Sequence, residues 1–137
     1  MRFMMFIYPK VQGGTAAAVE QAWMPPAEAV VAMTKYNDEL SKAGVLLSLD
    51  GLHSPDKAVR IEFPSGKPPV VKDGPFTEAK EMIGGYWVID VKSQDEAIEW
   101  AKRCPIGEGA AEIELRQVFE MSDFPADLQA AARAAQK

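Results

Sequence analysis

The chain has 137 residues, of which 47% are hydrophobic and 26% are charged, so it has the length of one domain and an ordinary globular composition. Its formal net charge of -5 argues against binding to the phosphate backbone of nucleic acids, which depends on clustered Lys and Arg. Cys104 and His53 are each the only residue of their type. An intramolecular disulfide is therefore excluded, ligands for a zinc or iron site are scarce, and we expect neither a metal nor a cofactor.

The N-terminal segment is apolar but short. Its run from Phe3 to Tyr8 ends at Pro9 and Lys10, which is far too short to cross a bilayer and short for a signal sequence. We therefore expect a cytoplasmic protein with no membrane partner. Both alternating sets of side chains in residues 3–8 are apolar, which is typical of a strand buried on both faces.

The next segments predict two helices of different length. Residues 11–25 contain two glycines and end at the first of two consecutive prolines, and we expect a loop with a short helix around 16–21. From Pro26 to Leu40 apolar residues recur every three or four positions, which predicts a longer helix. Gly44 suits the C′ position that ends it.

The middle of the chain predicts extended structure. "VLLSLDGL" (45–52) is expected to be a strand. "AVRIEF" (58–63) and "PVVKD" (69–73) flank the turn residues 64–67, which favours a hairpin. In "GGYWVIDV" (84–91) apolar side chains again point to both faces, which indicates a second interior strand.

A further helix, a strand and a tail complete the chain. Ser93 and Glu96 have the spacing of a capping box, and Pro105 ends the helix that they begin. "EIELRQVF" (112–119) is the last predicted strand, and an alanine-rich helix follows Pro125.

The order strand, helix, strand, hairpin, strand, helix, strand is that of an α+β, ferredoxin-like split βαβ fold. Both helices of this fold pack on one face of an antiparallel sheet. Because residues 3–8 and 85–91 are apolar on both sides, the uncovered face should bury itself against a second copy. The pattern therefore predicts a homodimer joined sheet to sheet.

One nine-residue motif carries a family resemblance. "DGPFTEAKE" (73–81), followed by "GGYWVID", "EAIEWAKRCP" and "EIELRQVF", resembles the DGPF proteins of the YCII-related superfamily. The resemblance covers one domain over residues 1–123 and leaves 124–137 as an alanine-rich helical tail. It implies a dimeric α+β barrel of ferredoxin-like subunits, but it does not specify a reaction.

The resemblance also implies a site. In related YCII proteins a His-Asp pair at the edge of a cleft is the suggested active site, and the matching residues here are His53 and Asp73. An imidazole titrates near neutral pH and passes protons, while a carboxylate fixes its tautomer. In the alternative, His53 is a solvated loop residue and Asp73 fixes a turn in which Gly74 supplies a backbone that can take positive φ.

The charged end of the motif supplies further candidates. Glu78, Lys80 and Glu81 lie between two predicted strands, where pocket rims commonly form. Lys80 would hold an anionic ligand, Glu81 would exchange a proton, and Arg60 would serve as a second anion holder. A solvated charged turn is the alternative interpretation.

Two functions fit these residues. One is a cofactor-free small-molecule enzyme that uses His53 and Asp73 as an acid/base pair beside the sheet. The other is a non-catalytic dimeric module that binds a ligand or a protein, linked to transcriptional regulation because some DGPF relatives accompany extracytoplasmic-function sigma factors. The sequence does not choose between them.

Overall fold

The centre of the protein is an antiparallel sheet. The computed structural model describes residues 1–11, 15–74 and 82–136, and within this part four strands pair in the order β2, β5, β1, β6. These strands are β1 (Arg2–Pro9), β2 (Leu46–Gly51), β5 (Gly85–Asp90) and β6 (Ala111–Gln117). The two interior strands, β1 and β5, are those whose sequences are apolar on both faces.

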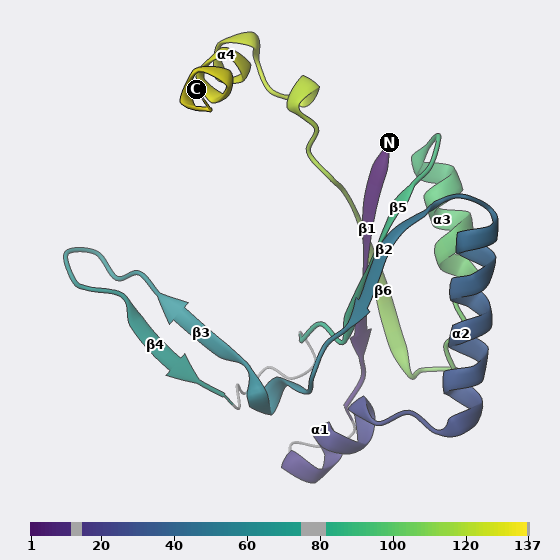
Figure 1. Cartoon of the computed structure of the whole chain (residues 1–137). Helices are drawn as coiled ribbons and strands as arrows, with labels where there is room; N and C mark the ends of the chain where they lie inside the picture. The colour runs from purple at the N-terminus through teal and green to yellow at the C-terminus, as the bar shows by residue number, and fades with distance from the viewer. Residues whose placement is uncertain (12–14, 75–81, 137) are drawn as a thin grey trace.

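Two helices cover one face of this sheet. α2 (Ala27–Lys42) and α3 (Gln94–Lys102) lie side by side on the same face (Figure 1). α2 connects β1 to β2 with β5 between them, and α3 connects β5 to β6 with β1 between them. This double split βαβ arrangement confirms the predicted α+β, ferredoxin-like fold.

The helix ends follow the signals in the sequence. Gly44 has a φ of 75° just after α2, where the left-handed conformation ends a helix. At the start of α3, Oγ of Ser93 accepts a hydrogen bond from the amide of Glu96 at 3.1 Å. The Glu96 carboxylate accepts from the amide of Lys92, one residue earlier than in the ideal capping box.

The hydrophobic core lies between the helices and the covered face. The odd-numbered side chains of β1 point into it, and Met5 faces Trp87 on one side and Leu115 on the other. Ten residues of the described chain form the buried cluster: Phe3, Met5, Tyr36, Leu40, Val45, Trp87, Ile89, Val91, Ala97 and Cys104.

The opposite face of the sheet has an apolar centre and a polar border. We call this surface the open face, defined by Met4, Phe6 and Tyr8 of β1 with Tyr86 and Val88 of β5, all half-buried in the single chain. At its border, the Tyr86 hydroxyl donates to Asp50 at 2.8 Å, and the Tyr8 hydroxyl donates to Glu114 at 3.0 Å.

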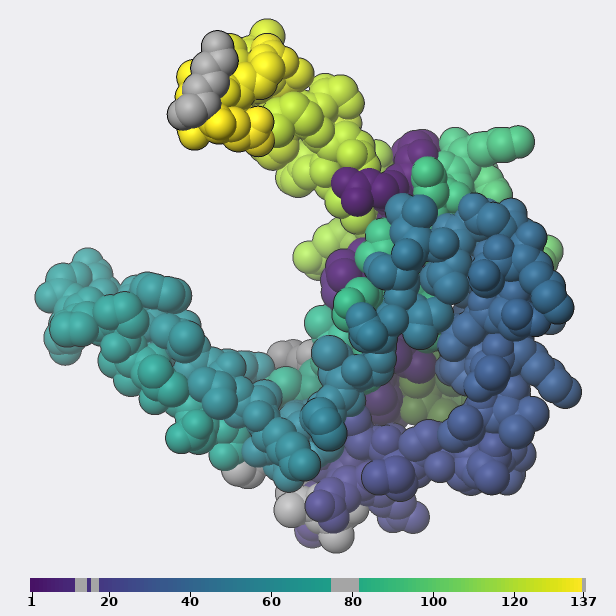
Figure 2. All heavy atoms as spheres, in the orientation of Figure 1, coloured from purple at the N-terminus to yellow at the C-terminus, as the bar shows by residue number. Residues whose placement is uncertain are grey.

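Two elements project beyond the open face. β3 (Val59–Glu62) and β4 (Val70–Asp73) form the predicted hairpin, but as a separate two-stranded sheet. The predicted terminal helix is present as α4 (Ala126–Ala135). Figure 1 shows both on the side of the sheet away from α2 and α3, and Figure 2 shows a wide hollow between them.

Candidate functional site

His53 lies where the chain leaves the sheet for the hairpin. It follows β2 by two residues and precedes the 3₁₀ turn η1 (Pro55–Lys57). The Leu52 amide donates to the carbonyl oxygen of Gly84 at 2.9 Å, and Pro55 is buried. The segment on both sides of His53 is therefore anchored, while the imidazole itself is exposed.

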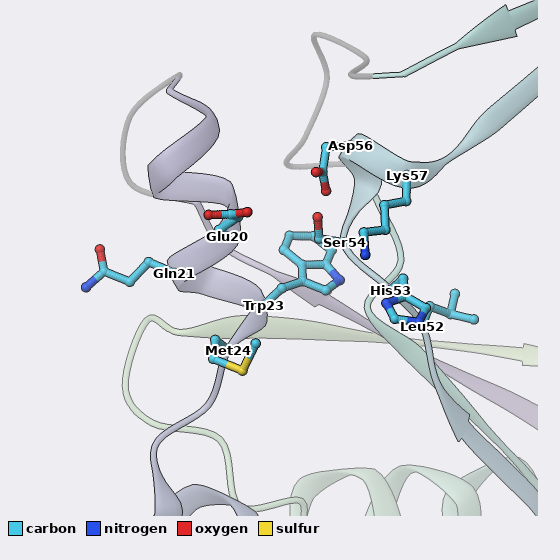
Figure 3. Close-up of a pocket in the computed structure, with 9 residues that line it drawn as sticks. All are labelled: Glu20, Gln21, Trp23, Met24, Leu52, His53, Ser54, Asp56 and Lys57. Atoms are coloured by element: carbon cyan, nitrogen blue, oxygen red, sulfur yellow. The ribbon is translucent and has the colours of Figure 1, made fainter.

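A cleft of about 570 Å³ opens between this segment and α1 (Ala16–Trp23). We call it the α1 cleft. Its volume lies within the range of small-molecule sites. Figure 3 shows the lining residues: Glu20, Gln21, Trp23, Met24, Leu52, His53, Ser54, Asp56 and Lys57.

A second cleft of about 380 Å³ adjoins the same segment. It shares Leu52, His53, Ser54 and Lys57 with the α1 cleft and adds Arg60 of β3. The guanidinium of Arg60 lies 3.6 Å from the sulfur of Met82. His53 thus borders two adjoining clefts, which is the placement expected of a residue that meets a ligand.

Two polar atoms in the α1 cleft are shielded from solvent. Within the described part of the chain, neither Nε1 of Trp23 nor Oγ of Ser54 has a hydrogen-bond partner. Such groups are rare in folded proteins, because each loses its contacts with water without replacement. Lys57 forms no ion pair with any residue that the structure describes. The two unpaired atoms belong to residues that line the cleft, but they have no surface accessible from it.

The first residues of the DGPF motif support the His53 segment. The amide of Gly74 donates to the carbonyl oxygen of Ala58 at 2.8 Å. A Cβ at position 74 would lie 2.8 Å from the carbonyl oxygen of Pro55. Gly74 does not use the positive φ that glycine allows. Glycine is required here because two backbone segments approach closely.

The structure places His53 and Arg60 at one cleft and Asp73 elsewhere. Asp73 is the last residue of β4, lies opposite Val59 in the hairpin register, and is exposed. Both His53 and Asp73 are described, and no hydrogen bond or ion pair joins them. The predicted pairing of the two stays a prediction.

Glu78, Lys80 and Glu81 lie outside the described residues, so their candidate roles also stay predictions.

Six polar residues of the α1 cleft were not predicted from the sequence: Glu20, Gln21, Trp23, Ser54, Asp56 and Lys57. Three of them belong to "HSPDK" (53–57), and the high proportion of polar residues in this stretch could have marked it as a candidate site. Trp23 had no such signal, because only the fold brings α1 against this segment.

Searches for two other kinds of site gave negative results. No group of three or more His, Cys, Asp or Glu side chains able to hold a metal ion occurs among the residues that the structure describes. None of the helices in the described ranges has the length and apolar character needed to cross a bilayer.

Comparisons with known proteins identify relatives of this chain. The family model of the YCII-related domain matches residues 1–122. A stretch of 33 residues, 24% of this chain and 27% of the relative, is 48% identical to the uncharacterized protein R00369 of Rhizobium meliloti (strain 1021). That match therefore spans about a quarter of the relative's length.

A solved structure with some similarity is that of 5-chloro-2-hydroxyhydroquinone dehydrochlorinase (TftG) from Burkholderia phenoliruptrix AC1100, in complex with 2,5-dihydroxybenzoquinone. Its TM-score is 0.44 and its sequence identity is 16%, over 89% of this chain and 98% of that one.

Proposed function

The chain belongs to the YCII-related family, and we propose that it is a small-molecule enzyme in which His53 transfers protons to and from a ligand. The observation that carries this proposal is the position of the only histidine, exposed at the border of two adjoining clefts. An imidazole donates and accepts protons near neutral pH without any cofactor. The reaction class is proton transfer at an ionisable carbon or oxygen of the ligand.

A carboxylate is the expected partner of His53. Asp73 is the partner that the family resemblance implies, and its neighbour Gly74 is hydrogen-bonded to Ala58 beside η1. Asp56 is a second candidate, because it lines the α1 cleft together with His53. A carboxylate in either position would stabilise the imidazolium that forms when His53 takes a proton. Asp56→Asn and Asp73→Asn distinguish the two.

The test of the proposed function follows proton exchange rather than a complete reaction. The protein is incubated in D₂O with a panel of ketones, aldehydes and lactones, and loss of carbon-bound protons is followed by NMR. We expect exchange with at least one compound and at least a hundredfold slower exchange with His53→Gln, the lower end of general-base contributions. Arg133→Gln, at the far end of the chain in α4, is the control and should behave like the wild type.

The alternative function is a non-catalytic dimeric module that binds a ligand or a protein in a regulatory context. Its supporting observation is the open face, whose apolar centre suits a second copy of the chain. We propose the homodimer under both functions. A compound that binds near His53 without any proton exchange or conversion would favour the module over the enzyme.

A further inference from the structure

We infer that the β3–β4 hairpin of one copy packs against the C-terminal arm of a second copy, so that the two sheets of the dimer meet with opposite ends together. The C-terminal arm is defined as residues 118–136, which include the 3₁₀ turn η3 (Met121–Asp123) and α4. This inference rests on the homodimer proposed under both functions, and it adds which segments of the two copies are in contact.

The surface area of the single chain indicates that a large part of it becomes covered. The chain exposes 9688 Å² to solvent at a mass of 15.0 kDa. A folded monomer of this mass exposes about 7,000 Å². The excess is about three times the area of about 800 Å² that a standard interface takes from one partner. The two projections on the side of the open face contribute to this excess, because a wide hollow separates them (Figure 2).

Both projections present apolar side chains to solvent. Four apolar side chains of the hairpin are each more than half exposed: Val59, Ile61, Phe63 and Val71. The exposed apolar side chains of the C-terminal arm are Phe119, Met121, Phe124 and Leu128. Burial of one side chain of this kind contributes roughly 1.5–3 kcal/mol. Each projection therefore has the apolar surface that the centre of an interface needs.

The two projections leave the sheet at opposite ends. β2 ends at Gly51, which pairs with Gly85 of β5, and Gly85 pairs with Ile7 near the end of β1. β6 ends at Gln117, which pairs with Phe3 near the start of β1. A two-fold dimer that joins the open faces therefore has two possible arrangements. Like ends together bring hairpin to hairpin and arm to arm, whereas opposite ends together bring hairpin to arm twice.

The charges of the two projections favour the second arrangement. Residues 59–73 hold three basic and two acidic side chains, whereas residues 118–136 hold three acidic side chains and one basic side chain. Within the chain Lys72 pairs with Glu62 and Arg2 pairs with Glu120, and the two segments keep opposite signs when these pairs are set aside. Like charges brought together across an interface cost free energy, and complementary charges fix the register of docking. Hairpin against arm is therefore the arrangement that the charges select.

Cross-linking between cysteines tests which segments meet. Ile61→Cys on the hairpin and Leu128→Cys on α4 are prepared as two proteins of different mass, mixed to exchange subunits, and treated with a short bismaleimide. We expect a cross-linked heterodimer from the mixture and at least tenfold less product from either variant alone. The wild type, whose Cys104 is buried, should give no product. Val31→Cys, at a similarly exposed position on α2, is the matched control and should give no product when mixed with Leu128→Cys.

Leu128→Gln measures the same contact from the side of the arm. Because it replaces an apolar side chain by a neutral polar one, we expect the dissociation constant of the dimer to rise about tenfold. Amides of residues 59–73 should then exchange hydrogen faster at a given protein concentration, although the substitution lies in α4. A role confined to the arm itself would leave the hairpin amides unaffected. Val31→Gln is the control and should change neither quantity.

Two results would each overturn the inference. One is cross-linking of Ile61→Cys with itself that is as efficient as in the mixture, and the other is a Leu128→Gln protein with the dimer affinity and hairpin exchange of the wild type. The homodimer fails separately: a wild type that is monomeric in ultracentrifugation would remove both, whereas a dimer without product from the mixture would reject only the contact between hairpin and arm. Proton exchange that depends on His53 is measured independently of these outcomes.

Discussion

At the scale of single residues, some buried polar groups of the described chain have a hydrogen-bond partner and others do not. The hydroxyl of Tyr36 donates to the carbonyl oxygen of Trp100 at 2.7 Å, and the indole of Trp87 donates to Asn37 at the same distance. Both bonds lie within the core, where an unpaired group would cost about 1–3 kcal/mol. Trp23 lacks such a bond within the described chain, although its Nε1 atom is also shielded from solvent.

Cys104 predicts how stability depends on alkaline pH. Burial raises the pKa of its thiol from 9.0 to about 12. The folded protein therefore holds the proton more tightly than the unfolded chain, so this contribution is full below about pH 9 and is lost as the pH rises toward 12. We expect the free energy of unfolding to fall between pH 9 and 11, by at most about 1.4 kcal/mol per pH unit from this group.

The measurement is urea unfolding at pH 8, 9, 10 and 11 under reducing conditions, for the wild type and for Cys104→Ala. The variant should be less stable at pH 8 and should lose less stability over the interval. Burial also raises the pKa of Tyr36, so some decline at the alkaline end should persist in the variant. If the free energy of unfolding fell equally with pH in the two proteins, Cys104 would not be the cause of the alkaline loss of stability.

At the scale of elements, the apolar face of the β3–β4 hairpin is exposed. Val59, Ile61 and Val71 are all exposed, while Lys72 pairs with Glu62 at 2.6 Å on the other face. An isolated two-stranded hairpin is at best marginally stable in water. We expect its amides to exchange hydrogen quickly in dilute protein and more slowly at concentrations where a second copy binds.

Hydrogen exchange followed by mass spectrometry at several protein concentrations tests this expectation. Peptides from β1 and β5 are the internal control, because these interior strands are paired on both sides and should be protected throughout. Protection of the hairpin that is high and independent of concentration would mean that the single chain stabilises it.

The same elements show which parts of the fold the sequence could predict. Clear sequence signals mark four elements: β1, β5, α2 and α3. These signals are a hydrophobic period, a helix cap or a stop residue, and each depends only on neighbours in the chain. The pairing of the hairpin strands does not follow from such local signals. The sequence predicted its two strands but not that they form a sheet of their own, because strand pairing depends on residues distant in the chain.

The candidate site was harder to predict for the same reason. His53 was found from its chemistry and the family resemblance, and it does border two clefts. Trp23 was not found, since nothing in α1 indicates that it will face residues 52–57. The close packing at Gly74 was also not predicted, because close approach between two backbone segments leaves no mark in local sequence.

At the scale of the whole molecule, we expect the open face, the hairpin and α4 to contact the same second copy. The open face is apolar at its centre, and the two projections extend beyond it around a hollow (Figure 2). Exposed apolar side chains also occur along the C-terminal segment, where Phe119 stacks on Phe124 at 5.0 Å between ring centroids. A stable interface of standard size buries about 800 Å² on each partner.

Val88→Lys tests the homodimer at the centre of the open face. Val88 lies between Met4 of β1 and Ser48 of β2, so a lysine here would place a charge in the middle of a sheet-to-sheet interface. Burying that charge without a partner is costly, and we expect the variant to be a monomer at concentrations where the wild type is a dimer. Analytical ultracentrifugation gives the mass of each, and circular dichroism checks that the variant is folded.

Val31→Lys, the same change at an exposed position on α2, is the matched control and should remain a dimer. A folded Val88→Lys protein that dimerises as strongly as the wild type would exclude the open face as the interface.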